Sequence, residues 1–121
     1  MPSVAIIQFL KEEFVGSKVA IFRVSQRNWL TTIWLSKARD DTFMCSADEE
    51  VQEGGISRDL PAKDDLRSGS EIYDAVAEFT DNYELWLEDA DWRGIAKALS
   101  TFNHELEREF LVAWQERHKG T

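Results

Sequence analysis

The feature that most constrains the fold is a long series of apolar residues at helical spacing near the C-terminal end of the chain. From Asp91 to His118, large apolar side chains recur every three or four residues, which places them on one face of an α-helix. These side chains are Ile95, Leu99, Phe102, Leu106, Phe110 and Trp114. We therefore expect one long amphipathic helix that packs this stripe against a sheet or against a second copy of itself.

The segment before residue 40 has the composition of β-structure. Residues 17–37 contain two runs rich in β-branched and aromatic residues, separated by the polar residues 25–28, which indicates an antiparallel hairpin. Residues 42–46 are a candidate third strand, so either a hairpin or a three-stranded meander is expected. Alternate residues of each run should share one face. These are Ala20, Phe22 and Val24 in the first run, and Trp29, Thr31, Ile33 and Leu35 in the second.

Two further segments complete the expected α+β architecture. Ser3 is a suitable cap for an N-terminal helix running to about Phe14, because apolar residues at 6, 9, 10 and 14 have helical spacing. Residues 47–70 are densely charged and contain a Gly pair and a Pro, so we expect a long acidic surface loop. Two amphipathic helices follow, the second of them long. A chain of 121 residues has the length of a single domain, residues 1–121.

The first of these two helices is expected over residues 71–88. Its apolar positions are separated by four, three, four and three residues, and Ser68 with Glu71 forms the pattern of a capping box. The apolar positions are Ile72, Val76, Phe79, Tyr83 and Trp86. For residues 83–88 an alternation of apolar and acidic residues leaves a strand open as the alternative.

This same segment has an unusual distribution of charge. Residues 71–89 contain seven carboxylates and no basic residue, within a chain whose net charge is −9. In a continuous helix six of them would form one ridge: Glu71, Asp74, Glu78, Asp81, Glu84 and Glu88. Three explanations of such a ridge are open. It could be a solubilising surface, it could dock a cationic partner or imitate a phosphate backbone, or it could bind a cation. No metal-ligand motif accompanies the ridge, so we expect no metal and no cofactor.

Catalytic motifs are not recognisable in this chain. Cys45 is the only cysteine, which excludes an internal disulfide and fits a reducing compartment, and its apolar neighbours predict a buried side chain. His104 and His118 lie outside any known motif, and charged residues near His104 have the spacing of ordinary pairs on an exposed helix. We expect a protein that is not an enzyme.

Direct nucleic-acid binding is disfavoured by the net negative charge. One segment mixes cations with tryptophan, a pattern found both in single-strand binders and in ordinary hairpins. Its residues are Arg23, Arg27, Trp29, Trp34, Lys37 and Arg39. The first 14 residues have no basic region and no long apolar run, so neither a signal peptide nor a membrane span is expected, and the cytoplasm is the expected location.

The function expected from these features is that of a non-enzymatic acidic binding protein that neutralises a basic partner, such as a toxin, a nuclease or a nucleic-acid-binding protein. In charge and size the chain resembles immunity proteins, antitoxin-like inhibitors and nucleic-acid mimics. The expected contact residues are carboxylates and nearby aromatic anchors: Asp74, Glu78, Asp81, Tyr83, Glu84, Trp86, Glu88, Asp91 and Trp92.

Two other classes remain open. One is a small dimeric chaperone for a secreted or assembled client. In its small size, its acidity and its α+β pattern the chain is similar to type III secretion chaperones. The other is an enzyme with a Glu/His site. Five tryptophans exceed what one compact core usually needs, which is compatible with a homodimer.

Overall fold

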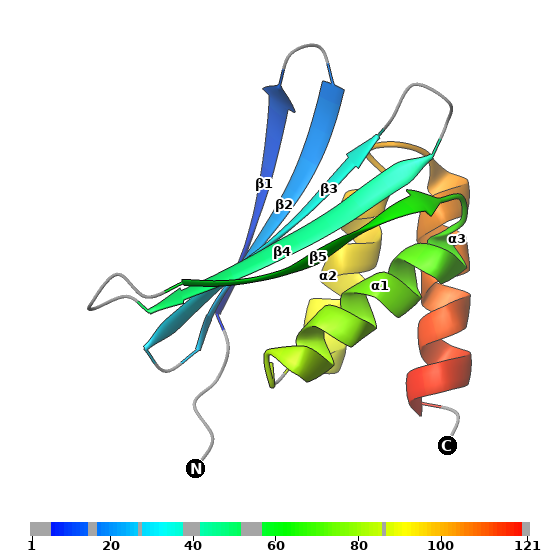
Figure 1. Ribbon diagram of the computed structural model, residues 1–121. Coiled ribbons are helices and arrows are strands. Elements are labelled where there is room, and N and C mark those ends of the chain that lie inside the picture. Colours follow the sequence, from blue (N-terminus) through cyan, green and yellow to red (C-terminus); the bar gives the residue numbers. More distant parts are fainter. Residues whose placement is uncertain are drawn as a thin grey trace.

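The computed structural model describes residues 6–14, 17–26, 28–37, 42–51, 57–85 and 87–119, and confirms the α+β class (Figure 1). Five antiparallel strands come first and are followed by three helices. The strands follow the order of the sequence across the sheet, so each is paired with its neighbour in the chain. They are β1 (Ile6–Phe14), β2 (Ser17–Gln26), β3 (Trp29–Lys37), β4 (Phe43–Val51) and β5 (Ser57–Leu66).

One face of the sheet, here called the inner face, forms half of the core. Ile33 lies between Phe22 of β2 and Ala47 of β4 in the strand register, and all three side chains are buried. Val24, Leu35 and Cys45 are buried in the same way. The expected hairpin and its alternation are therefore confirmed for the described residues, and the expected third strand is present and longer than predicted.

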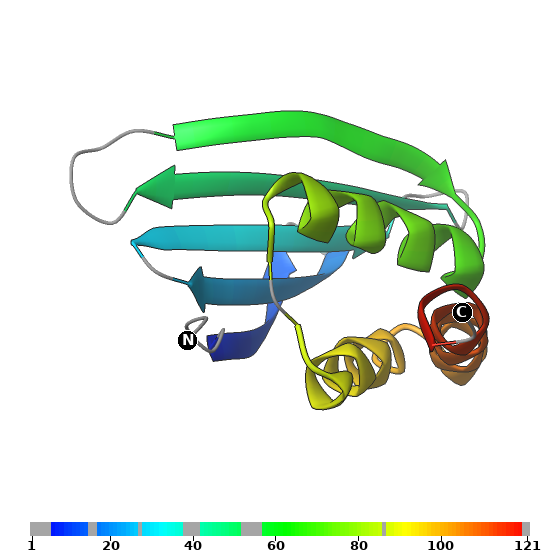
Figure 2. The same cartoon turned by 90° about the horizontal axis from the view of Figure 1, so that it is seen from below.

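The helices α1 (Gly69–Asn82), α2 (Asp89–Leu99) and α3 (His104–Trp114) all lie on the inner face (Figures 1 and 2). A π-helical turn, η1 (Gln115–Lys119), follows α3. The first helix contacts β4 and β5, α2 contacts β1 and β2, and α3 packs against both helices. Tyr73, Trp92 and Phe110 meet where the three helices join, with ring centroids 5.5 Å apart for Tyr73 and Trp92 and 5.4 Å apart for Tyr73 and Phe110.

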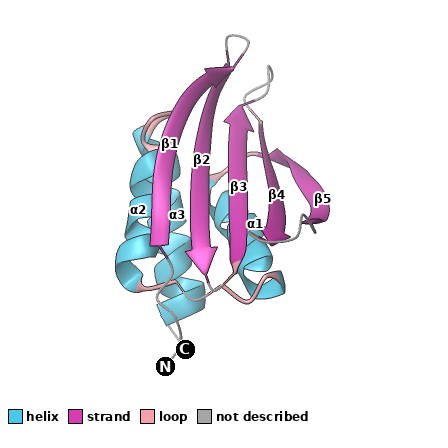
Figure 3. Ribbon diagram, turned by 90° about the vertical axis from the view of Figure 1, so that its left-hand side faces the viewer, coloured by secondary structure: helices cyan, strands magenta, loops and turns pink. Residues whose placement is uncertain are grey.

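The opposite face of the sheet, here called the outer face, has no helix over it among the described residues. Figure 3 shows the five strands in front and the helices behind them. Helices therefore cover the inner face, whereas no described helix covers the outer face of the same strands.

The expected N-terminal helix is wrong over the described part of that segment, because Ile6–Phe14 is strand β1. Residues 1–5, including Ser3, lie outside the described residues. All nine residues of β1 pair with β2 in an unbroken antiparallel register from Ile6 opposite Ser25 to Phe14 opposite Ser17. Helical spacing over so short a segment is a weak signal, and the available strand partner decides the outcome.

The expected acidic loop over residues 47–70 is also wrong. Strand β4 continues to Val51, and β5 occupies Ser57–Leu66; residues 52–56 lie outside the described residues. Charged residues and Pro61 are tolerated because β5 is at the edge of the sheet, where one side of the backbone needs no partner strand. Shifts in the β4–β5 register accompany this irregular composition.

The expected long C-terminal helix is divided into two. Helix α2 ends at Leu99, and α3 begins after Asn103, whose side chain accepts a hydrogen bond from the Leu106 N–H at 2.9 Å. Asn103 is thus an N-cap in the middle of the apolar stripe. Both halves of the stripe still face the core, with Ile95, Leu99, Leu106, Phe110 and Trp114 buried.

Candidate functional site

Four of the ridge carboxylates lie on α1, and the first of them has a structural role. Glu71, Asp74, Glu78 and Asp81 are all exposed. Ser68 is the N-cap, as predicted, and its hydroxyl accepts from the Glu71 N–H at 3.2 Å. The Glu71 carboxylate accepts from the Arg67 N–H at 3.1 Å. Its charge therefore helps to start the helix.

Two further ridge carboxylates are paired with basic residues from other parts of the chain. Arg117 of η1 contacts Asp74 at 2.9 Å, and Lys63 of β5 contacts Glu78 at 2.7 Å. The prediction of a ridge without neutralising partners is therefore wrong in its N-terminal half. The pattern in the sequence could not show this, because both cations come from distant segments.

Helix α1 ends earlier than expected, at Asn82, and residues 83–88 are neither helix nor strand where described. The N–H of Glu84 donates to the Asp81 carbonyl at 3.2 Å, and the N–H of Leu85 donates to the Thr80 carbonyl at 2.8 Å. This pair of bonds is a Schellman motif, which requires a left-handed residue just past the helix. That residue is Glu84, with a φ of 54°.

The carboxylates that follow belong to the start of α2. Glu88 is its N-cap, and Glu88 and Asp91 form a reciprocal capping box in which the Glu88 N–H donates to the Asp91 carboxylate at 2.8 Å. Asp89 lies in the first helical turn, where the helix dipole favours negative charge. These three acids therefore stabilise the start of α2 locally.

Asp81 and Glu84 differ from the other acids of the segment, because the local backbone disfavours them. Asp81 is in the last turn of α1, at the negative end of the helix dipole. That turn holds no basic residue. Glu84 has the left-handed conformation that glycine adopts most readily. Both side chains are exposed. We call these two residues the acidic corner.

Two of the three aromatic residues expected to anchor a partner do not lie on the surface. Tyr83 is 6% exposed and Trp92 is 3% exposed. The Tyr83 hydroxyl donates to the Ala47 carbonyl at 3.3 Å, and Trp92 packs against Tyr73 and Phe110. Trp86 lies outside the described residues. The apolar anchor predicted for this site is therefore wrong for Tyr83 and Trp92, which fill the core.

The residues considered for catalysis whose side chains are described do not form a reactive group. Cys45 is buried, as predicted, and burial raises the pKa of its thiol to about 12, so the reactive thiolate is disfavoured. His104 is exposed and lies 3.8 Å from Glu107, while Arg108 pairs with Glu105 on the same helix. Across the described residues, no group of three His, Cys, Asp or Glu side chains could hold a metal ion.

The strand register also reveals a buried acid that the sequence pattern did not identify. Glu49 of β4 is buried and accepts a hydrogen bond from the Thr31 hydroxyl at 3.2 Å. Phe43, Cys45 and Ala47 share its face of the strand. Extending the predicted strand beyond residue 46 would have placed Glu49 on the inner face.

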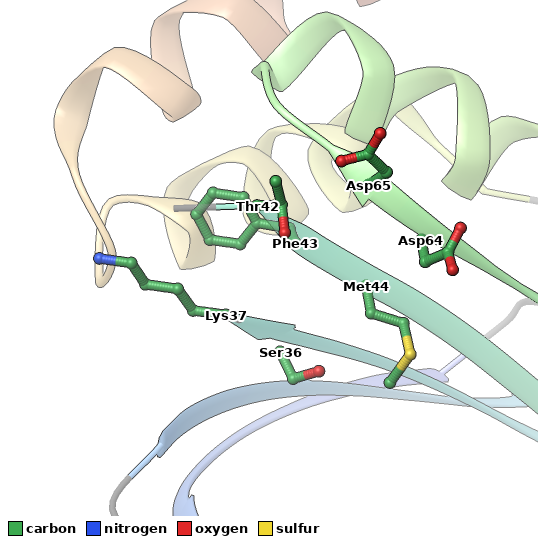
Figure 4. Close-up of a pocket in the computed structure, with 7 residues that line it drawn as sticks. All are labelled: Ser36, Lys37, Thr42, Phe43, Met44, Asp64 and Asp65. Carbon is green, nitrogen blue, oxygen red and sulfur yellow. The ribbon is translucent and has the colours of Figure 1, made fainter. Parts of the chain in front are cut away.

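A hollow of about 520 Å³ lies at one end of the sheet, between β3, β4 and β5. Lys37, Asp64 and Asp65 line it, together with Ser36, Met44 and neighbouring residues. Figure 4 shows the Lys37 side chain pointing away from the two carboxylates. The charged groups do not converge on a common point, so the hollow lacks the arrangement of a small-molecule site.

Comparison with known proteins gives no family for this chain. No family model matches it, and no significant match was found among curated proteins or solved structures. In the described part of the chain, no helix is long and apolar enough to cross a membrane.

Proposed function

We propose that this chain is a non-enzymatic acidic binding protein that docks on a basic surface of another protein and blocks it through the acidic corner. The proposal is carried by Glu84, an exposed carboxylate in a left-handed backbone conformation. Backbone strain of this kind is found disproportionately at functional positions. The cytoplasm is the proposed location, in keeping with the free thiol of Cys45.

Glycine would be less strained than glutamate at position 84. The left-handed conformation costs an L-residue about 1–2 kcal/mol, whereas glycine adopts it freely. A glycine would therefore complete the Schellman motif with less strain than Glu84 does. An exposed charged side chain at a strained position is compatible with a role in binding another molecule.

Asp81, in the last turn of α1, also supports a binding role for the acidic corner. Its charge lies at the negative end of the α1 dipole, and Glu84 adds a second negative charge close by in sequence. The capping acids Glu88 and Asp91 of α2 extend the negative field around the corner. Such a field speeds association with a cationic surface and loses strength as salt is added.

The proposed partner is a basic protein: a toxin, a nuclease or another nucleic-acid-binding protein. Surfaces that contact phosphates are rich in Lys and Arg, and a set of carboxylates can occupy them in place of the nucleic acid. The net charge of −9 favours such an encounter over direct binding of nucleic acid.

The chaperone alternative has less support. It needed the C-terminal stripe and the Trp-rich hairpin to bury apolar segments of a client. The stripe is already part of the molecule's own core, with Leu99, Phe110 and Trp114 fully buried. Within the described part of the chain, the outer face of the sheet, which includes the Trp-rich hairpin, would remain for a client.

The proposed function is tested by capture from a lysate of the source cells on immobilised protein at about 50 mM salt. We expect the wild-type chain to retain a basic protein that elutes between about 0.05 and 0.5 M salt, as for an interaction governed by exposed charges. The Asp81→Asn/Glu84→Gln variant should lose that protein. Glu116→Gln, which removes an exposed charge from η1, is the control and should retain it.

Equal retention by the wild type and the double variant would contradict the proposal. So would an equal loss with Glu116→Gln, because binding would then depend on net charge and not on the acidic corner.

A further inference from the structure

We propose that the outer face of the sheet is an interface between two copies of this chain, related by a two-fold axis that runs along β3. This inference uses residues on the opposite side of the sheet from the helices and is independent of the proposed function (Figure 3). Strand alternation places the outer-face side chains between those of the inner face. On β3 and β4 they include Leu30, Thr32, Trp34, Ser36, Met44, Ser46, Asp48 and Glu50.

The centre of this face carries apolar groups that the core does not use. Trp34 is partly exposed on β3, whereas Trp92 and Trp114 are buried among the helices. Met44 is 42% exposed, although it is a large apolar side chain. Aromatic residues and methionine are enriched in protein interfaces relative to other surfaces.

Side chains at the centre of the outer face are already closely packed in the single copy. Thr32 is only 7% exposed, although no described helix covers the outer face. Its neighbours on the same face must therefore lie against it. A surface that is already ordered loses less conformational entropy when it binds.

The charges on this face are arranged so that it complements itself. In the strand register, Arg23 of β2, Thr32 of β3 and Asp48 of β4 form one row across the sheet. In this row the positive charge lies on the β2 side of β3 and the negative charge on the β4 side. Glu50 adds a second, exposed carboxylate two residues along β4.

A two-fold axis along β3 converts this polarity into two ion pairs. The rotation keeps each position along the strand and exchanges the β2 side with the β4 side. Arg23 of one copy then faces Asp48 of the other, and the reverse pair forms by symmetry, as in an isologous interface. Trp34 of each copy lies next to the axis, where the two apolar centres meet.

The face is large enough for a stable dimer. Five strands about 4.8 Å apart and nine residues long give a face of about 24 Å by 30 Å, or about 700 Å² in plan. Standard interfaces bury about 800 Å² on each partner, and accessible area exceeds plan area on a surface covered with side chains. Face-to-face sheets packed about 10 Å apart are also a common arrangement. The acidic corners lie on the helical side and stay open in such a dimer.

The test is the mass of the full chain in solution, measured by sedimentation velocity from about 1 to 200 µM. We expect a wild-type dimer, and a dissociation constant at least tenfold weaker for Trp34→Lys. Val112→Lys is the matched control, because Val112 is 43% exposed on α3, and it should dimerise as the wild type does. Circular dichroism establishes that each variant is folded before its mass is compared.

Charge exchange tests the orientation of the two copies. Arg23→Glu should weaken the dimer at least tenfold by placing acid against acid, and Arg23→Glu/Asp48→Arg should restore it by reversing each pair. A wild-type chain that is monomeric at 200 µM would overturn the proposal. A folded Trp34→Lys variant that dimerises like the wild type would overturn the outer-face interface, and failure of the double exchange to restore the dimer would overturn the axis along β3.

Discussion

The hydroxyl of Tyr83 donates a hydrogen bond to the backbone carbonyl of Ala47, 3.3 Å away, and joins the end of α1 to β4. Both residues are buried, and Glu84 follows directly in the chain. The bond therefore helps to fix the acidic corner against the sheet. Tyr83→Phe keeps the ring and removes the bond, so we expect the free energy of unfolding to fall by about 1 kcal/mol. Urea unfolding measures the change, and an unchanged midpoint would show that the bond contributes nothing.

Glu84→Gly should make the fold more stable and partner binding weaker. Glycine relieves the strain of the left-handed conformation, so the free energy of unfolding should rise by about 1 kcal/mol. Glu84→Gln keeps the strain and removes the charge, so its stability should change by less than about 0.5 kcal/mol. Thermal unfolding of both variants, beside the capture assay, separates the roles of backbone and charge. Loss of stability in Glu84→Gly would contradict the structural account of this position.

Gly69→Ala tests the close approach of α1 to α3. A Cβ at Gly69 would lie 2.7 Å from the Cβ of Glu109 and 2.7 Å from the backbone nitrogen of Phe110, and it would overlap the Leu106 carbonyl. Backbone atoms cannot move aside cheaply, so the helices must separate. The Gly69 N–H would also be drawn away from the Glu109 carboxylate that it contacts at 3.1 Å. We expect a loss of about 1–3 kcal/mol in urea unfolding, even though alanine has the higher helix propensity.

The buried thiol of Cys45 gives the protein a specific weakness at high pH. Burial raises its pKa from 9.0 to about 12, so the folded state holds a proton that the unfolded state releases. This contribution is fully present below pH 9 and is lost as the pH rises toward 12. Each pH unit in this window should lower the free energy of unfolding by about 1.4 kcal/mol.

The comparison variant for this pH dependence is Cys45→Ala, which has no thiol to titrate. Its stability should therefore fall less steeply than that of the wild type when urea unfolding is compared at pH 9.5 and pH 10.5. Burial also raises the pKa of Tyr73, which is present in both proteins, so only the difference between the two slopes is assigned to Cys45. Identical slopes would show that the thiol is not the titrating group.

The spacing of apolar residues along the chain predicts those parts of this fold in which the spacing clearly fits either a strand or a helix. The hairpin of β2 and β3 follows from its β-branched and aromatic runs, and the buried faces of α2 and α3 follow from the apolar spacing of residues 95–114. The break between these two helices was missed because Leu99, Phe102 and Leu106 keep helical spacing across it. Asn103 was the available signal, since it is a preferred capping residue followed by a new helical turn.

Elements that depend on a distant partner could not be predicted in this way. The sequence of β1 fits a helix by spacing, and only its pairing with β2 makes it a strand. The composition of β5 fits a loop, and only its position at the edge of the sheet permits Pro61 and its many charges. For the acidic segment, Lys63 and Arg117 neutralise Glu78 and Asp74 from 15 and 43 residues away. Charge counts along the chain do not contain that information.

The order of the strands has a consequence for how the chain acquires its structure. Every strand pairs with its immediate neighbour, so the sheet can grow hairpin by hairpin without waiting for a remote segment, and such topologies fold rapidly for β-structure. The three helices come last, however, and they are the described elements that cover the inner face. A nascent or truncated chain that ends before Gly69 would expose Phe22, Ile33 and Leu35 to solvent, and it would depend on molecular chaperones to avoid aggregation.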